Sequence, residues 1–222
     1  MLNRAFVIVA VVIGLIGCES TPSQKMPPLH QAAVEGASSE LAQLLSQPNI
    51  VDIDLVDGTG HTALMAAINQ QQYAAAQMLI DNGANIHRQN RPGKTALVLL
   101  ASHQKPPLSL IKNLFDINSR LNANYDDKTL VEVFRTSDSL FEPNKTEIVE
   151  FLESAASELI AKRTEIMVEM DGEEFPATSA YVAEGGDLNF EDDSFYTPLM
   201  KATNIGNLTA MTFLLDNGAD AN

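Results

Sequence analysis

The chain has 222 residues, with 14 basic and 29 acidic side chains and a net charge of −15 at pH 7. A field of that sign repels nucleic acids and anionic membrane surfaces, so it argues against nucleic-acid binding and favours a basic partner. The single cysteine has no partner for an intramolecular disulfide. Tryptophan is absent, and small aliphatic contacts must therefore carry the stability of the fold.

The segment 1–17 has the layout of a secretory signal peptide. A short basic lead containing Arg4 is followed by an almost unbroken apolar run over residues 5–17. This run is too short to cross a bilayer as a stable helix. We therefore expect a cleaved signal peptide, with an uncleaved anchor as the alternative.

The apolar run ends in Leu15-Ile16-Gly17-Cys18, which resembles the bacterial lipobox. The resemblance implies cleavage before Cys18 and acylation of this cysteine, although a general secretory signal with an incidental cysteine is also open. Residues 18–26 are then the lipidated cysteine and a polar tether, whose eight residues after Cys18 reach at most roughly 28 Å. The protein is expected on the periplasmic face of the cell envelope. Glu19, in place of an aspartate that favours inner-membrane retention, tilts the expectation towards the outer membrane.

Threonines recur at a nearly constant spacing in the rest of the chain. Thr62, Thr95 and Thr129 are evenly spaced, and Thr197 follows after twice that interval, with Thr164 inside the double gap. A second short sequence motif lies at the same distance after each of Thr62, Thr164 and Thr197. It reads Asn82-Gly83-Ala84-Asn85, Glu184-Gly185-Gly186-Asp187 and Asn217-Gly218-Ala219-Asp220.

These two motifs recur together with one period, and this pattern resembles the ankyrin repeat. The resemblance implies an all-α solenoid of about six helix–turn–helix repeats with short hairpin tips over residues 27–222. Each threonine can cap a first helix, and glycines such as Gly83 can end a second helix in the left-handed conformation. An ordinary helical bundle with coincidental glycines is the alternative.

The repeats are of unequal quality. We expect them near 27–56, 57–89, 90–123, 124–158, 159–191 and 192–222. The first repeat begins with the clearest copy of the family's opening motif, Pro28-Leu29-His30. In the fourth, Ser154-Ala155-Ala156 replaces the glycine stop, which predicts a helix longer than the family norm within residues 144–170.

Catalytic and metal-binding patterns are absent from the sequence. The histidines have no zinc-site spacing, and the resemblance implies that His30 makes a hydrogen bond within its own repeat. The acidic clusters lack the calcium-loop pattern, and there is no phosphate-binding glycine loop or Gly-x-Ser-x-Gly. We predict no catalytic residue, no cofactor and no metal. A hydrolase using an acidic cluster is a remote alternative.

A recognition surface remains, and the family pattern places it on the hairpin tips and on the exposed side of the first helices. The candidate partner-binding residues are Thr59, His61, Asn69, Gln70, Gln89, Arg91, Lys94, Ser102, His103, Asp193, Tyr196 and Asn204. The tip over residues 87–94 is basic, whereas the neighbouring tips at 52–57 and 124–127 are acidic. This contrast indicates either charge balance between adjacent tips or a mixed-charge docking face.

We therefore expect a lipid-anchored envelope protein that binds another protein as a scaffold or adaptor, with stress protection as one role that the resemblance implies. An immunity or inhibitor protein that blocks a toxin or hydrolase is the alternative.

Overall fold

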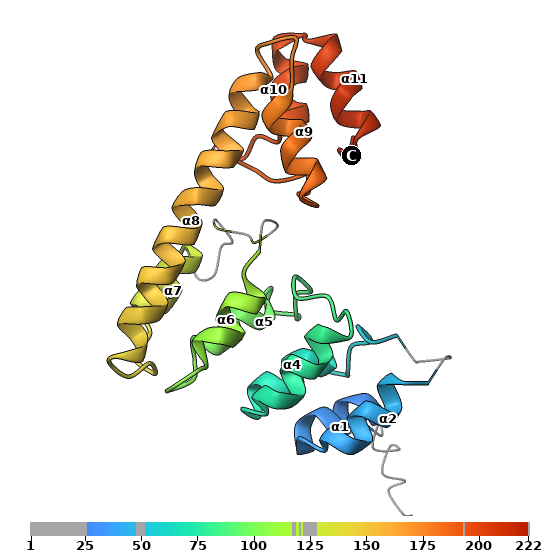
Figure 1. Ribbon diagram of the computed structural model, residues 1–222, viewed down its shortest axis with the longest axis vertical. Helices are drawn as coiled ribbons and strands as arrows, with labels where there is room; N and C mark the ends of the chain where they lie inside the picture. Colours follow the sequence, from blue (N-terminus) through green and yellow to red (C-terminus); the bar gives the residue numbers. More distant parts are fainter. Residues whose placement is uncertain are drawn as a thin grey trace, which may run out of the picture.

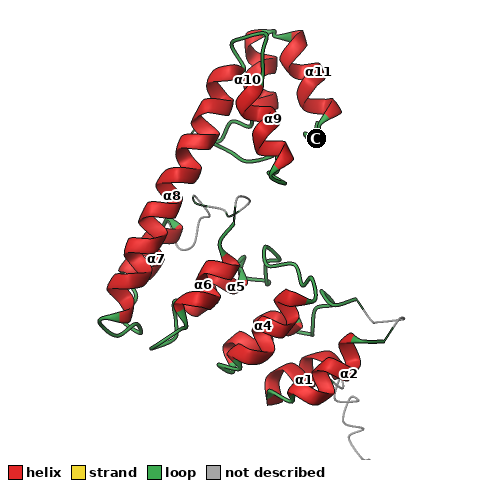
Figure 2. Ribbon diagram, in the orientation of Figure 1, coloured by secondary structure: helices red, strands yellow, loops and turns green. Residues whose placement is uncertain are grey.

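Every regular element in the described part of the chain is a helix (Figure 2). The computed structural model describes residues 26–47, 52–116, 119, 121, 128–192 and 194–221. The predicted signal peptide, Cys18, Asp193 and the acidic tip at 124–127 lie outside these ranges. In chain order the helices are α1 (Pro28–Glu35), α2 (Ser38–Leu45), α3 (Ala63–Asn69), α4 (Tyr73–Asp81), α5 (Ala96–Leu100), α6 (Leu108–Leu114), α7 (Leu130–Arg135), α8 (Asn144–Glu169), α9 (Pro176–Ala183), α10 (Pro198–Ile205) and α11 (Leu208–Asp216).

The first six helices form three stacked pairs at one end of the molecule (Figure 1). The first helices pack α1 on α3 and α3 on α5, and the second helices pack α2 on α4 and α4 on α6. Close packing is possible because alanines occupy the contacts. Ala32, Ala33, Ala67 and Ala76 are completely buried.

Threonines begin the first helices at the predicted positions. Thr62, Thr95, Thr129 and Thr197 all have extended backbone, and each side chain accepts a hydrogen bond from the amide three positions later. Thr129 also forms a capping box with Glu132. The capping prediction is confirmed at these four positions, because each hydroxyl satisfies an amide that has no partner inside the helix.

The predicted glycine stops are confirmed as well. Gly83 and Gly218, which follow α4 and α11, have φ values of 85° and 94°. This left-handed conformation is costly for a residue with a Cβ and nearly free for glycine.

Helix α8 departs from the pattern of short helices. It runs without a break through 26 residues, about 39 Å, and confirms the expected long helix. Thr164 lies inside it and is not a cap, since its hydroxyl donates to the carbonyl oxygen of Ile160. The predicted repeat boundary at 158/159 also lies inside α8. No glycine or proline interrupts this segment, so the helix continues.

The continuity of α8 changes the direction of the chain. The second helix of the fourth repeat and the first helix of the fifth form one rod, so no hairpin tip separates them. The rod carries α9, α10 and α11 to the end of the molecule opposite α1 and α2 (Figure 1). There the stack resumes, with α9 packed on α8 and α10 on α11.

Candidate functional site

The turns of three hairpin tips share one hydrogen-bond pattern. Each begins with Asp57, Asn90 or Asp192, whose side-chain oxygen accepts from the amide four positions later at 3.0, 2.8 and 3.0 Å. The amide of the same first residue donates to the carbonyl of that later residue. The fourth position of the tip has a positive φ. It is Gly60 in the first of these tips and Phe195 in the last.

The acidic side chains of the tip at 52–57 support the loop itself. Asp57 accepts from the amide and hydroxyl of Thr59 at 2.8 and 2.6 Å. Burial alone would raise the pKa of Asp57, but the hydrogen bonds from Thr59 and His61 outweigh it and lower this pKa. Asp54 accepts from the amide of Asn85, at 2.8 Å, in the next tip. These carboxylates are therefore occupied by structural hydrogen bonds.

Two histidines, His30 and His61, connect successive repeats. His30 is buried, and its Nε2 lies 2.9 Å from the carbonyl oxygen of His61. The predicted bond within its own repeat is wrong, because the partner belongs to the next repeat. His61 places Nδ1 2.6 Å from the Thr59 hydroxyl and Nε2 3.2 Å from Nδ2 of Asn90. Both rings thus hold neighbouring repeats together.

His103 is buried rather than exposed to a partner. Only 7% of its surface is accessible, and Nδ1 lies 3.0 Å from the hydroxyl of Tyr73. Burial lowers the pKa of His103. The His103 side chain lies in the contact between the second and third repeats. It is therefore not on the exposed surface where we expected a partner to bind.

The other candidate residues do not form one surface. His61 and Lys94 are half-buried, Asp193 lies outside the described residues, and the exposed candidates are Thr59, Asn69, Gln70, Gln89, Arg91, Ser102, Tyr196 and Asn204. Gln89 and Arg91 lie in one cleft, whereas Tyr196 and Asn204 belong to the sixth repeat, whose helices α10 and α11 lie near the opposite end of α8 (Figure 1).

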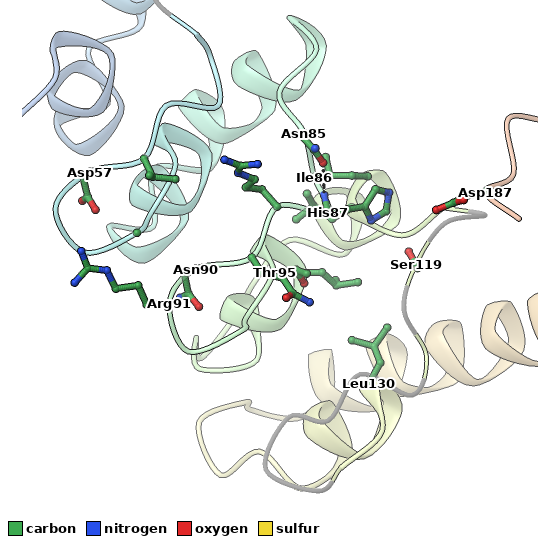
Figure 3. Close-up of a pocket in the computed structure, with 16 residues that line it drawn as sticks. Asp57, Asn85, Ile86, His87, Asn90, Arg91, Thr95, Ser119, Leu130 and Asp187 are labelled. Carbon is green, nitrogen blue, oxygen red and sulfur yellow. Dashed lines mark hydrogen bonds between the residues drawn. The ribbon is translucent and has the colours of Figure 1, made fainter. Parts of the chain in front are cut away.

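A cleft of about 750 Å³ opens beside the tip at 85–91 (Figure 3). Its basic residues are His87, Arg88 and Arg91, and its lining includes Asp187 from the loop after α9. The remaining lining residues are Val56, Asp57, Gly60, Asn85, Ile86, Gln89, Asn90, Thr95, Leu97, Leu114, Ser119 and Leu130. Charged and apolar side chains are therefore available side by side.

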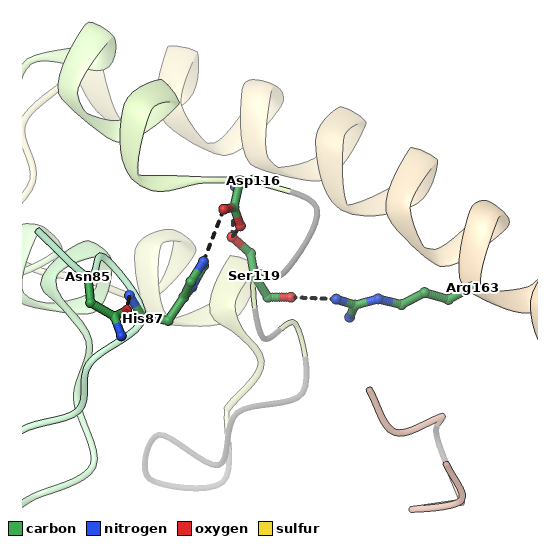
Figure 4. A network of polar contacts seen from close by, with 5 residues as sticks. All are labelled: Asn85, His87, Asp116, Ser119 and Arg163. Atoms are coloured by element: carbon green, nitrogen blue, oxygen red, sulfur yellow. Dashed lines mark hydrogen bonds and ion pairs between the residues drawn. The ribbon is translucent and has the colours of Figure 1, made fainter. Parts of the chain in front are cut away.

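A polar network connects this tip to α8 (Figure 4). Nε2 of His87 lies 3.0 Å from Oδ2 of Asp116, and the Asp116 amide donates to the Ser119 hydroxyl at 2.9 Å. Nη2 of Arg163 in α8 donates to the Ser119 carbonyl at 3.2 Å. Contacts between side chains and loop backbone therefore fix the position of the tip relative to the long helix.

Arg163 continues the network towards α9. Its Nε donates to the Tyr181 hydroxyl at 3.3 Å, and its guanidinium carbon lies 5.1 Å from the centre of the Phe190 ring. Tyr181 and Phe190 meet edge to face at 5.7 Å. Arg163 was not among the residues predicted from the sequence, where its one signal is a basic residue in an expected long helix.

The arginines of the basic tip differ from the other charges around them. His87 pairs with Asp116, but no ion pair involves Arg88, Arg91 or Lys94 among the residues that the structure describes. Arg88 and Arg91 are also exposed. No ion pair therefore joins the basic tip to the described acidic tip, where Asp54 and Asp57 accept hydrogen bonds from loop amides.

Metal-ligand clusters and membrane spans have distinct signatures in a structure. In the described ranges, no three histidine, cysteine, aspartate or glutamate side chains are grouped so that they could hold a metal ion. None of the described helices combines the length and the apolar composition needed to cross a membrane.

Comparison with known proteins places these features in context. The family model described as "Ankyrin repeats (3 copies)" matches residues 9–90 and 29–128, which together span just over half of the chain. The chain is also similar to the crystal structure of the ankyrin repeat domain of Bcl-3, described as a unique member of the IkappaB protein family. That similarity has 22% identity, a TM-score of 0.48, and coverage of 89% of each chain.

Proposed function

The chain belongs to the ankyrin-repeat family, as its sequence predicted, and on this basis we propose that it is a membrane-anchored scaffold or adaptor that binds another protein in the bacterial cell envelope. Repeat stacks of this kind present extended surfaces for protein recognition. The observation that carries the proposal is the exposed pair Arg88 and Arg91, which lines a cleft and has no ion pair in the described structure.

The cleft favours a partner segment that carries carboxylates next to an apolar side chain. A guanidinium binds a carboxylate through two parallel hydrogen bonds, which fixes orientation as well as affinity. Val56, which is 38% exposed in the same lining, can contact an apolar side chain. Since the chain carries a net charge of −15, an acidic partner would be repelled elsewhere and would bind in one place.

Anchoring through Cys18 rests on the lipobox-like ending of the apolar run. The replacement Cys18→Ser should abolish both acylation and cleavage at that site. Labelling cells with a radioactive fatty acid measures the first effect, and the size of the chain on a gel measures the second. Label retained on the serine variant would exclude the lipoprotein assignment.

Partner binding is tested by affinity capture from membranes that contain the full chain. The double variant Arg88→Glu with Arg91→Glu should reduce recovery of the captured partner more than tenfold, because each lost charged hydrogen bond is worth about 1.5–3 kcal/mol. The matched control, Lys105→Glu with Lys112→Glu, changes the net charge equally at exposed positions outside the cleft.

Salt provides a second criterion for the same partner. Capture by the wild-type chain should weaken as salt rises, because screening reduces the attraction between the basic tip and an acidic segment. Equal recovery with the wild-type chain and both double variants, at low and high salt, would place recognition elsewhere. Loss only in Asp126→Lys with Asp127→Lys would assign recognition to the acidic tip.

A further inference from the structure

The cleft beside the basic tip is lined by two loops that occupy the same position in different repeats. Asn85, in the loop after α4, and Asp187, in the loop after α9, each end the glycine-containing motif of their repeat. Both line the cleft (Figure 3). The side-chain oxygen of each residue accepts from the amide two positions later, at 2.9 Å for Asn85 and 3.0 Å for Asp187. The second and fifth repeats therefore meet at this cleft through equivalent turns.

The turn in the fifth repeat does not require the charge of Asp187. Asn85 makes the same contact in the second repeat with the oxygen of a neutral amide. Asparagine and aspartate both form turns of this kind, so an asparagine at position 187 would also satisfy the loop amide. Asp187 is exposed, and its negative charge acts on whatever occupies the cleft.

The basic and acidic side chains of the cleft do not neutralise each other. Arg88 and Arg91 are exposed, and they form no ion pair with Asp187 or with another carboxylate in the described part of the chain. Asp57 also lines the cleft, but its carboxylate accepts hydrogen bonds from its own tip. The same space is therefore exposed to two guanidinium groups and to the carboxylate of Asp187.

Arg163 of α8 connects the two sides of the cleft. Its Nη2 donates to the Ser119 carbonyl, in the network of the basic tip (Figure 4), and its Nε donates to the Tyr181 hydroxyl. The Tyr181 carbonyl in turn accepts from the amide of Gly186, directly before Asp187, at 2.9 Å. Groups that are held in place before binding lose less conformational entropy when a partner binds. The fold therefore sets the spacing between the arginines and Asp187 in advance.

We propose that the cleft binds an extended segment of the partner protein in which a basic residue lies beside acidic ones, and that Asp187 selects this basic residue. The inference rests on the proposed function and adds the charge pattern of the segment. Carboxylates of the segment pair with Arg88 and Arg91, and its cation lies against Asp187. An all-acidic segment would bring like charge against Asp187, which is unfavourable.

The size of the cleft agrees with such an occupant. Its volume of about 750 Å³ is typical of ligand pockets, which have roughly 300–1,000 Å³. It accommodates a few side chains of an extended segment and not a folded domain.

Peptides of equal composition test the charge pattern on the full chain. Each fluorescently labelled probe has two glutamates, one leucine and one lysine among glycines and serines, and only the position of the lysine changes. Because these isomers carry the same net charge, general attraction is equal for all of them. Fluorescence anisotropy should show tighter binding at one or two neighbouring lysine positions, by about three- to fivefold, as expected for an exposed ion pair. Equal affinity of all isomers overturns the inference.

The variant Asp187→Asn should abolish the preference among the isomers. Asparagine keeps the turn, as Asn85 shows, so the loss reports the charge and not the shape of the loop. Glu191→Gln is the matched control, because it removes the same charge at an exposed position outside the cleft, and it should keep the preference. A preference that persists in Asp187→Asn contradicts the role of this carboxylate and overturns the inference.

Charge reversal distinguishes recognition from an indirect effect on the loop. Asp187→Lys should bind the best isomer less tightly than a probe with glutamate in place of its lysine, which is the opposite of the wild-type order. A change that only distorted the loop would weaken both probes and leave their order unchanged. That second result overturns the inference.

The arginines separate this inference from the proposed function. Arg88→Glu with Arg91→Glu should weaken every isomer by about tenfold or more, because each isomer loses its charged hydrogen bonds. Asp187→Asn should weaken only the preferred isomers. If all isomers bind equally and still require the arginines, the inference fails and the proposed use of the arginines stands. If no isomer binds the wild-type chain, or if binding does not depend on the arginines, both fail.

Discussion

Two threonines show how a residue's role depends on the backbone around it. Thr95 has φ −82° and ψ 168°, and its hydroxyl accepts from the amide of Val98 at 3.5 Å. Thr164 occurs in the same sequence register but lies inside α8, where its hydroxyl donates to the Ile160 carbonyl. A cap requires an extended residue followed by unpaired amides, and that condition exists only where a helix begins.

The replacement Thr95→Val should therefore lower the free energy of unfolding by about 1 kcal/mol, within a range of roughly 0.5–2 kcal/mol, because it removes a cap while nearly preserving shape. Thr164→Val is the matched control and should change stability by less than about 0.5 kcal/mol. Urea unfolding followed by circular dichroism measures both. An unchanged midpoint for Thr95→Val would contradict the capping role.

His103 gives the stability a dependence on pH. Because burial lowers its pKa from the ordinary value of 6.5, the unfolded chain takes up a proton at a higher pH than the folded chain does. The stability that the neutral ring provides is complete above pH 6.5 and is lost as the pH falls below it. His103→Gln should therefore lose less stability than wild type between about pH 7.5 and 5.5. Urea midpoints at the two pH values measure the difference, and parallel losses would disprove this role.

At the scale of elements, α8 shows what a local pattern can and cannot predict. The missing glycine at residues 154–156 predicted a long helix, because helix continuation depends on nearby residues. The position of the following helices was not predictable in this way. It depends on Arg163, which meets Ser119 and Tyr181 from distant parts of the chain. Contacts of that kind leave no periodic signal in the sequence.

Replacing Arg163 with lysine should loosen the junction between α8 and α9. An ammonium group cannot serve the Ser119 carbonyl, the Tyr181 hydroxyl and the Phe190 ring together, so we expect a loss of about 1–3 kcal/mol. Lys162→Gln, at the adjacent residue, removes only exposed ion pairs and should therefore cost much less stability than Arg163→Lys. Urea unfolding separates the two variants. Equal midpoints would show that the network does not stabilise the junction.

At the scale of the whole molecule, the cleft was only partly predictable. Gln89 and Arg91 were identified as candidates because the tip register marks them, and both line the cleft. Ser119 and Asp187 were not, because their presence in the lining follows from the course of α8 and the loop after α9. His103 was misplaced for a related reason, since its burial depends on Tyr73 in another repeat. Local registers predict the repeats, and the site depends on how the repeats are joined.

Helices of different repeats should also differ in local stability. Most of α3 is buried, whereas α11 buries only Ala210 and Leu214. Because stability in a repeat array is carried by contacts between neighbours, backbone amides should exchange with solvent faster in α11 than in α3. Hydrogen exchange at low protein concentration measures this contrast. Equal protection of the two helices would contradict it.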